Sequence, residues 1–260
     1  MGAIDGVLLD IDGVLAVSWH ALPGAIDTIE WLRRQGMPFR LITNTTTHTR
    51  RDLAETLRSA GIDVEPSEIV TAVVATASYL RSHHPGARVS LLSDGDARED
   101  LDGVRIVGRD DDADVVVLGG ACDDFTYGAM NAVFRTLMDG ATLVGMHRNL
   151  YWRTSEGWQL DSGAYVAGLE EATGRRAAIC GKPSAAYFEE ALRMLGMPAD
   201  RAAMVGDDVN NDVLGAQAAG LTGVLVRTGK FMPEDLERAD GEPDHVLDSI
   251  ADLPAWLASR

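Results

Sequence analysis

Two carboxylates stand directly after the first apolar run of the chain. Asp10 and Asp12 follow residues 6–9, a run that predicts a short buried strand. Because side chains alternate along a strand, both carboxylates should leave it on the same side. Two like charges this close repel each other, and a bound cation or a shared proton would relieve the repulsion. The alternative is an ordinary strand-ending turn, since Asp and Gly13 are common turn residues.

Three further polar segments stand at the ends of predicted strands or at the starts of predicted helices. They are Thr43-Asn44, Gly181-Lys182-Pro183-Ser184 and a segment over 206–212 that contains Asp207, Asp208 and Asp212. Ligands of open α/β sheets bind at the carboxyl ends of the strands, so these segments can converge with Asp10 and Asp12. The Thr43 hydroxyl and nearby backbone N–H groups suit phosphate oxygens, and clustered carboxylates suit Mg²⁺.

Each of these segments also has an ordinary structural explanation. Thr43-Asn44 could be a turn that caps the next helix, Lys182 an exposed loop residue, and Asn210 or Asn211 a helix cap. However, Lys182 and Lys230 are the only lysines among 23 basic residues. An ammonium group is a compact charge whereas a guanidinium is a wide fork, so this scarcity favours a specific role for Lys182.

Composition excludes several classes of function. The 260 residues carry a formal net charge of −17, which argues against nucleic-acid binding because such proteins need a basic face. No apolar run is long enough to cross a membrane, the first residues lack a signal-peptide pattern, and the two cysteines have no metal-like spacing. We therefore expect a cytoplasmic protein without nucleic-acid or membrane partners, and adaptation to salt remains an alternative reason for the acidity.

Strand and helix patterns alternate along the chain, which predicts parallel βαβ units. The predicted strands cover 6–9, 39–42, 88–92, 114–118, 142–144, 202–205 and 224–226. The predicted helices cover 23–36, 51–60, 127–138, 184–195, 211–219 and 248–259. This order predicts an α/β fold with a Rossmann-like parallel sheet, in which residues 1–73 and 180–260 form the core and residues 74–179 form a smaller inserted α/β domain.

The four polar segments, in this order, resemble the four motifs of the haloacid dehalogenase (HAD) superfamily. The insert resembles the α/β cap of its NagD-type branch. Segments 41–46 and 224–230 are similar to the subgroup of phospholysine phosphohistidine inorganic pyrophosphate phosphatases. The resemblance covers nearly the whole chain. It implies a HAD core with an inserted cap and a Mg²⁺-dependent phosphatase that acts on a small phosphorylated molecule.

The resemblance also implies the catalytic and metal-binding roles. Asp10 would be the nucleophile that forms an aspartyl-phosphate. Asp12 would protonate the leaving group and then activate water. Mg²⁺ would be held by Asp10, by the backbone carbonyl of Asp12 and by Asp207.

The remaining motif residues would hold the phosphoryl group. Thr43 and the backbone N–H of Asn44 would bind phosphate oxygens. Lys182 would offset the charge on the nucleophile and the transferring group. Asp212 would orient Lys182 or a metal-bound water.

One segment departs from the NagD-type pattern. Many caps of this type carry Thr-Asn-x-Asp where this chain has Met-His-Arg-Asn, within residues 146–153. His147, Arg148, Tyr151 and Trp152 are therefore candidates for substrate contact. The alternative is a solvated loop with aromatic packing. The sequence does not specify the substrate.

Other classes of function fit less well. A dehalogenase would not need Asp12. A phosphoacceptor signalling domain uses similar residues, but such domains are about half this length and have no cap. A non-catalytic phosphate-binding protein would tolerate the loss of an essential motif residue, and none is lost. A homodimer is possible, but nothing in the sequence specifies one.

Overall fold

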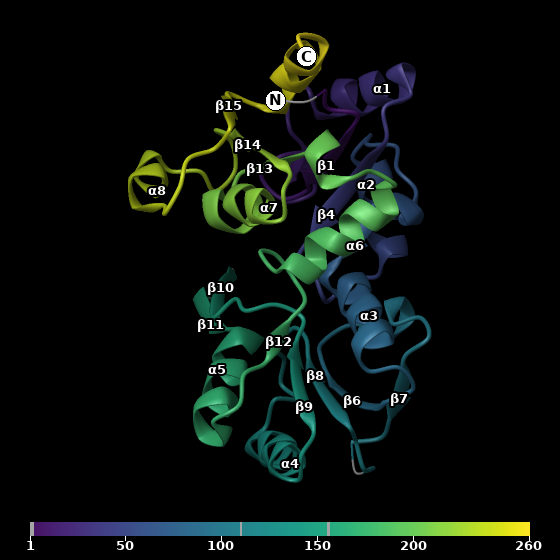
Figure 1. Ribbon diagram of the computed structural model, residues 1–260, viewed down its shortest axis with the longest axis vertical. Coiled ribbons are helices and arrows are strands. Elements are labelled where there is room, and N and C mark those ends of the chain that lie inside the picture. The colour runs from purple at the N-terminus through teal and green to yellow at the C-terminus, as the bar shows by residue number, and fades with distance from the viewer. Residues whose placement is uncertain (1–2, 110, 155–156) are drawn as a thin grey trace. The chain divides into compact units, whose positions relative to one another are not determined.

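The computed structural model describes residues 3–109, 111–154 and 157–260 (Figure 1). Contacts within the chain divide it into two units. The first unit contains the residues up to Thr43, Arg50–Val70 and Lys182–Arg260, and the second contains Asn44–Thr49 and Thr71–Gly181. Across the described ranges, no helix has both the length and the apolar character needed to cross a membrane.

The first unit is built on a six-stranded sheet with the order β15-β14-β13-β1-β4-β5. Its strands are β1 (Gly6–Asp10), β4 (Phe39–Thr43), β5 (Ile69–Thr71), β13 (Ala202–Gly206), β14 (Thr222–Val226) and β15 (His245–Leu247). β1 pairs in parallel with β4 and with β13, so that Leu9 lies opposite Leu41 and Val205. These strands are apolar along their length because helices cover both faces of the sheet. Their carboxyl ends lie at one edge, where the polar segments follow.

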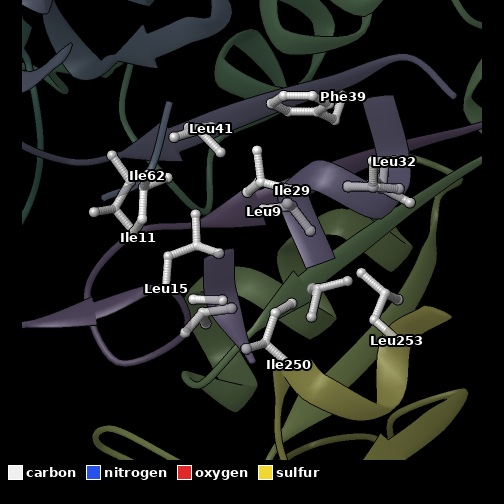
Figure 2. Close-up of a cluster of buried hydrophobic side chains, with 14 of the residues drawn as sticks. Leu9, Ile11, Leu15, Ile29, Leu32, Phe39, Leu41, Ile62, Ile250 and Leu253 are labelled. Atoms are coloured by element: carbon white, nitrogen blue, oxygen red, sulfur yellow. The ribbon is translucent and has the colours of Figure 1, made fainter. Parts of the chain in front are cut away.

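Helices and short turns complete the first unit. They are α1 (Ala25–Gln35), α2 (Arg50–Ser59), α6 (Ala185–Leu195), α7 (Gly215–Ala218), α8 (Pro233–Arg238) and α9 (Leu253–Ala258), with a π-helical turn at Val209–Leu214 and 3₁₀ turns at Pro66–Glu68, Ala199–Arg201 and Ile250–Asp252. A small hairpin, β2 (Ala16–Val17) and β3 (His20–Ala21), follows β1. Figure 2 shows Leu9 and Leu41 of the sheet in the core with Ile29 of α1 and Leu253 of α9. Burial of this layer is the main stabilising contribution.

The second unit has its own parallel sheet, with the order β12-β9-β8-β6-β7. Its elements are α3 (Ala72–His83), β6 (Arg88–Leu92), a 3₁₀ turn at Ala97–Asp100, β7 (Arg105–Val107), β8 (Val115–Leu118), α4 (Tyr127–Met138), β9 (Thr142–Gly145), the hairpin β10 (Tyr151–Thr154) and β11 (Gly157–Leu160), α5 (Ser162–Thr173) and β12 (Ala178–Ile179). Val73 and Leu80 of α3 pack in one cluster with Val115. Residues of α4 and α5 pack in a second cluster with Val116. Because neighbouring residues of β8 belong to different clusters, the helices cover both faces of the sheet.

The predicted α/β class with parallel sheets is confirmed, and the predictions over 88–92 and 127–138 match β6 and α4. Two predicted helices are partly wrong. The one over 211–219 begins as the π-helical turn and is α-helical only in α7, and the one over 248–259 shortens to α9. The pattern missed α3, which is buried around most of its circumference and so lacks an amphipathic period. It also missed β5, α5, β10, β11, β12, α8 and β15, and the short elements β2, β3 and β7.

Candidate active site

A buried ion-pair network lies where β1 ends. Asp10 is the last residue of β1 and only 4% of its surface is exposed. The Nζ atom of Lys182 lies 2.7 Å from Asp10 Oδ1 and 2.7 Å from Asp212 Oδ1. Lys182 is 6% exposed, so the alternative explanation of an exposed loop lysine is wrong. Lys182 therefore joins two carboxylates that come from opposite ends of the chain.

Asp207, the residue after β13, is enclosed by backbone. Its Oδ2 accepts a hydrogen bond from the backbone N–H of Lys230 at 2.6 Å. Gly13 and Gly229 have φ values of 85° and 65°, and a Cβ at either would lie 2.0 Å from that oxygen. Only glycine allows both this conformation and this close approach. Thr228 Oγ1 donates to the Gly13 carbonyl at 2.6 Å, which holds the two glycine loops together.

Three of the site carboxylates fit a divalent cation. Asp10, Asp207 and Asp212 are all buried, and each offers an oxygen within 4.8 Å of the others. Asp207 Oδ1 is buried and has no hydrogen-bond partner within the described parts of the chain. A buried carboxylate oxygen without a donor is costly unless a cation faces it. An all-oxygen donor set of this kind suits Mg²⁺. Asp12 is exposed and is not one of these three.

Burial controls the protonation of these groups. It raises the pKa of Asp10, and Lys182 opposes that rise. Burial also raises the pKa values of Asp207 and Asp212 to about 6 in each case. For Lys182, burial alone would lower the pKa, but Asp10 and Asp212 raise it well above its usual value, so the ammonium stays charged. A divalent cation would compete with protons for the Asp207 carboxylate.

Asp208 and Asp212 shape the turn that follows β13. Asp208 Oδ1 accepts hydrogen bonds from the backbone N–H groups of Asn210 (3.0 Å) and Asn211 (2.9 Å). The expectation that Asn210 or Asn211 caps this segment is therefore wrong, because Asp208 is the cap. Asp212 Oδ2 accepts from the backbone N–H of Asp208 at 3.2 Å. This contact fixes the carboxylate that faces Lys182.

Thr43 lies at the end of β4, buried at 3% exposure. Its backbone N–H donates to the hydroxyl of Tyr187 at 2.8 Å. Tyr187 is a residue of the site region that the sequence did not indicate, because its hydrogen-bond partners are backbone groups distant in the chain. Asn44 falls in the second unit, so its role in binding phosphate stays a prediction.

Comparisons with known proteins show the family of this chain. The haloacid dehalogenase-like hydrolase family matches residues 7–107, and a related HAD-hydrolase-like family matches residues 179–253. Haloacid dehalogenase-like hydrolase domain-containing protein 2 of Homo sapiens is 38% identical over 259 residues, which cover 95% of this chain and 98% of that protein. The chain belongs to the haloacid dehalogenase-like hydrolase family.

Further relatives place this HAD hydrolase in the NagD-type branch. The phospholysine phosphohistidine inorganic pyrophosphate phosphatase of Rattus norvegicus is 33% identical over 258 residues, covering 97% of this chain and 93% of that protein. The p-nitrophenyl phosphatase from Archaeoglobus fulgidus is 30% identical with a TM-score of 0.90, covering 98% and 100% of the two chains. NagD from E. coli K-12 is 28% identical with a TM-score of 0.88, covering 96% and 98%. The chain is therefore an enzyme of the HAD phosphohydrolase type.

The candidate substrate segment of this HAD hydrolase, residues 146–153, has an anchored part and an exposed part. His147 is 3% exposed, and its Nδ1 accepts from the backbone N–H of Asn149 at 3.3 Å. The Arg148 guanidinium donates to both carboxylate oxygens of the buried Glu170 on α5. Tyr151 and Trp152, in the hairpin, are 60% and 51% exposed. His147 and Arg148 therefore make contacts within the second unit, whereas Leu150, Tyr151 and Trp152 are each at least 50% exposed.

Proposed function

We propose that this HAD hydrolase is a Mg²⁺-dependent phosphatase that removes phosphate from a small molecule through an aspartyl-phosphate on Asp10. The observation that carries the proposal is the buried contact of Lys182 with Asp10 and Asp212, next to a carboxylate oxygen of Asp207 that lacks a donor among the described residues. This set combines a nucleophile, a fixed positive charge and oxygen ligands for a cation. Two relatives that are named as phosphatases support the same reaction class.

Asp10 and Asp12 carry out different parts of the reaction. An Asp10 oxygen attacks phosphorus in line, forming the acyl-phosphate bond while the bond from phosphorus to the leaving oxygen breaks. Asp12 gives its proton to that oxygen. The Asp12 carboxylate then takes a proton from water, whose oxygen attacks phosphorus and releases inorganic phosphate and free Asp10. The exposure of Asp12 suits this role, since it must meet both the leaving group and water.

Other residues hold the phosphoryl group and the cation. Thr43 and the Asn44 N–H bind phosphate oxygens, and Lys182 offsets their charge. Asp10, the Asp12 carbonyl and Asp207 would hold Mg²⁺, which neutralises repulsion between nucleophile and substrate.

A separate residue keeps the charges in place. Asp212 accepts from the Asp208 N–H and contacts Lys182. It therefore orients the ammonium toward Asp10.

In this proposal the cap consists of residues 74–179, which lie within the second unit. It contributes substrate selection rather than chemistry, because the proposed nucleophile and cation ligands all lie in the first unit. The net charge of −17 supports a small phosphorylated substrate rather than nucleic acid or a membrane surface. A cytoplasmic location belongs to the same proposal.

A substrate panel with a nucleophile variant tests this function. Phosphate release is measured from p-nitrophenyl phosphate, pyrophosphate and phosphoamidates, with Mg²⁺ and with a chelator. Asp10→Asn should abolish release because an amide cannot form the acyl-phosphate, while Asp27→Asn, at an exposed position in α1, should match wild type. Acid quenching should trap phosphoenzyme in wild type or Asp12→Asn but not in Asp10→Asn. Release at the wild-type rate by Asp10→Asn would contradict the mechanism, and phosphate binding without turnover would favour a binding protein.

A further inference from the structure

Tyr187 contacts the backbone at two of the points where the chain leaves the first unit. Its hydroxyl accepts from the N–H of Thr43 at 2.8 Å and lies 2.9 Å from the Thr43 carbonyl oxygen and 2.8 Å from that of Val70. The chain passes into the second unit after Thr43 and again after Val70, and it returns to the first unit at Arg50 and at Lys182. The Tyr187 hydroxyl therefore contacts the ends of the first two chain segments of the first unit, at Thr43 and Val70. Tyr187 itself lies on α6, near the start of the third segment.

The Tyr187 hydroxyl lies among buried backbone groups that hydrogen-bond to it. Tyr187 is fully buried, as are the backbone groups of β4 and β5 that it contacts. A phenol has one proton, which the two carbonyl oxygens share, while its lone pair accepts from the Thr43 N–H. Burial raises the pKa of Tyr187, so it keeps that proton. Without the hydroxyl, the N–H and both carbonyls would lose this partner inside the protein.

The contacts of Tyr187 also connect two parts of the proposed site. Lys182 lies just before α6 in the chain, and Tyr187 lies in the first part of that helix. Thr43 ends β4, whose Ile42 is paired with Asp10 of β1. The Tyr187 hydroxyl therefore joins the helix that follows Lys182 to the strand that ends in Thr43.

We propose that Tyr187 is a positioning residue that fixes Thr43 relative to Asp10 and Lys182 through the Thr43 backbone. The inference rests on the proposed function, in which Thr43 binds a phosphate oxygen. A phosphate contact is sensitive to small displacements, because hydrogen bonds weaken steeply as distance and angle depart from ideal values. Tyr187 touches neither phosphate nor cation in this account, so its effect should appear in phosphate binding rather than in the chemical step.

Tyr187→Phe removes the hydroxyl and keeps the ring, so the full chain should still fold. Thr28→Val is a matched control, because Thr28 is a buried hydroxyl of the same unit that donates to a backbone carbonyl, that of Ile250, at 3.1 Å. We expect Tyr187→Phe to raise the inhibition constant of inorganic phosphate and the KM by about 5- to 30-fold, with a smaller change in kcat. Thr28→Val should leave the phosphate inhibition constant, the KM and the kcat within about twofold of wild type, since its hydrogen bond is remote from the site.

Hydrogen exchange of the substrate-free full chain provides a readout that does not need activity. Peptides that contain Thr43 and Val70 should exchange faster in Tyr187→Phe than in wild type or Thr28→Val. Faster exchange together with weaker phosphate inhibition would support the positioning role. Unchanged phosphate inhibition would overturn it, whatever the exchange shows. Failure of the proposed function is distinguishable, because the wild-type protein itself would then release no phosphate from any substrate of the panel.

Discussion

Lys182 Nζ lies 2.7 Å from Asp10 Oδ1, although 172 positions separate the two residues in the chain. Both side chains are buried, and the ammonium also contacts Asp212. Burying such charges costs several kcal/mol per ion before their mutual attraction is counted, so an ion pair in this place adds little net stability. Its position at the carboxyl end of β1 is better explained by chemistry than by stability.

Lys182→Arg should lower kcat/KM by about 100-fold or more although the positive charge is kept. The guanidinium is wider than the ammonium and cannot sit between two carboxylate oxygens at these distances. Overpacking should also reduce the free energy of unfolding by about 1–3 kcal/mol. Steady-state kinetics and denaturant unfolding measure the two effects.

Lys230→Arg is the matched control for that substitution. Lys230 contacts Asp207 through its backbone N–H, which the substitution retains. Burial opposes the charge of the Lys230 ammonium, but Asp10 and Asp207 raise its pKa, and arginine keeps that positive charge near the site. Activity should stay within about threefold of wild type. If Lys182→Arg were as active as Lys230→Arg, the special role of Lys182 would be wrong.

Asp207→Asn should abolish most of the stabilisation that Mg²⁺ gives to the protein. A ligand that binds only the folded state raises its stability by mass action, and this substitution removes an anionic oxygen ligand. Thermal unfolding with and without millimolar Mg²⁺ measures the shift in Tm. Asp208→Asn removes the same charge one residue away and retains a capping side chain, so its Mg²⁺ shift should match wild type. Equal Mg²⁺-induced shifts in Tm for Asp207→Asn and Asp208→Asn would mean that the cation does not bind at Asp207.

The Mg²⁺ shift in Tm should also depend on pH. Burial raises the pKa of Asp207 to about 6, above its ordinary value of 3.8. Without metal, this group therefore stabilises the fold below about pH 4, and its contribution is lost as pH rises through 6. Mg²⁺ needs the carboxylate form, so its stabilising effect should grow between pH 5 and about pH 7. A shift in Tm that is constant over this range would contradict the prediction.

The sequence predicted the parts of the site that have distinctive residue types at strand ends. Asp10 and Asp207 could be found because parallel strands place their carboxyl ends at one edge of the sheet. Lys182 could be found because lysine is scarce in this chain and this one precedes a predicted helix. Tyr187 could not, because its partners are backbone groups of Thr43 and Val70, and any residue type supplies those. The helix α3 was missed because its buried residues surround it, which removes the periodic signal.

The sequence also could not predict which side chains of residues 146–153 are exposed and which are held by contacts. His147 and Arg148 occur beside Tyr151 and Trp152 in one basic and aromatic segment. Arg148 is engaged by Glu170, which lies on α5 and is distant in the sequence. A polar residue near a predicted strand end therefore indicates a candidate, and only tertiary contacts show which candidates are already engaged.

His147 should make the second unit less stable as the solution becomes mildly acidic. Burial lowers the pKa of this imidazole below its ordinary value of 6.5, and Asp161 opposes the shift. As pH falls through 6.5, the unfolded chain binds a proton that the folded chain resists, so stability is lost. His147→Gln cannot titrate, so its stability should fall less than that of wild type from pH 7 to about pH 5.

Trp152→Ala and Arg148→Ala should have different effects, although the two residues are close in sequence. Arg148 is bound to the buried Glu170, so its loss should destabilise the second unit by about 1–3 kcal/mol. Trp152 is half exposed and lies opposite Gln159 in the hairpin, so its loss should leave unfolding nearly unchanged. Denaturant unfolding of the two variants separates these outcomes.

Trp152→Ala should instead change which substrates are preferred, if the hairpin meets the substrate. Remote contacts contribute binding energy that grows with the size of the substrate, while the reacting groups act on the phosphoryl group alone. The ratio of kcat/KM for a bulky phosphate ester to that for p-nitrophenyl phosphate should therefore fall by about 5- to 10-fold. Trp158→Ala is the matched comparison, because it removes another tryptophan of the same hairpin. The ring centroids of Trp158 and Tyr151 lie 5.4 Å apart in an edge-on arrangement, and Trp158 is paired with Arg153, whereas Trp152 is paired with Gln159. An unchanged ratio in Trp152→Ala would mean that this side chain does not select substrate, and the interpretation of a solvated aromatic surface would hold.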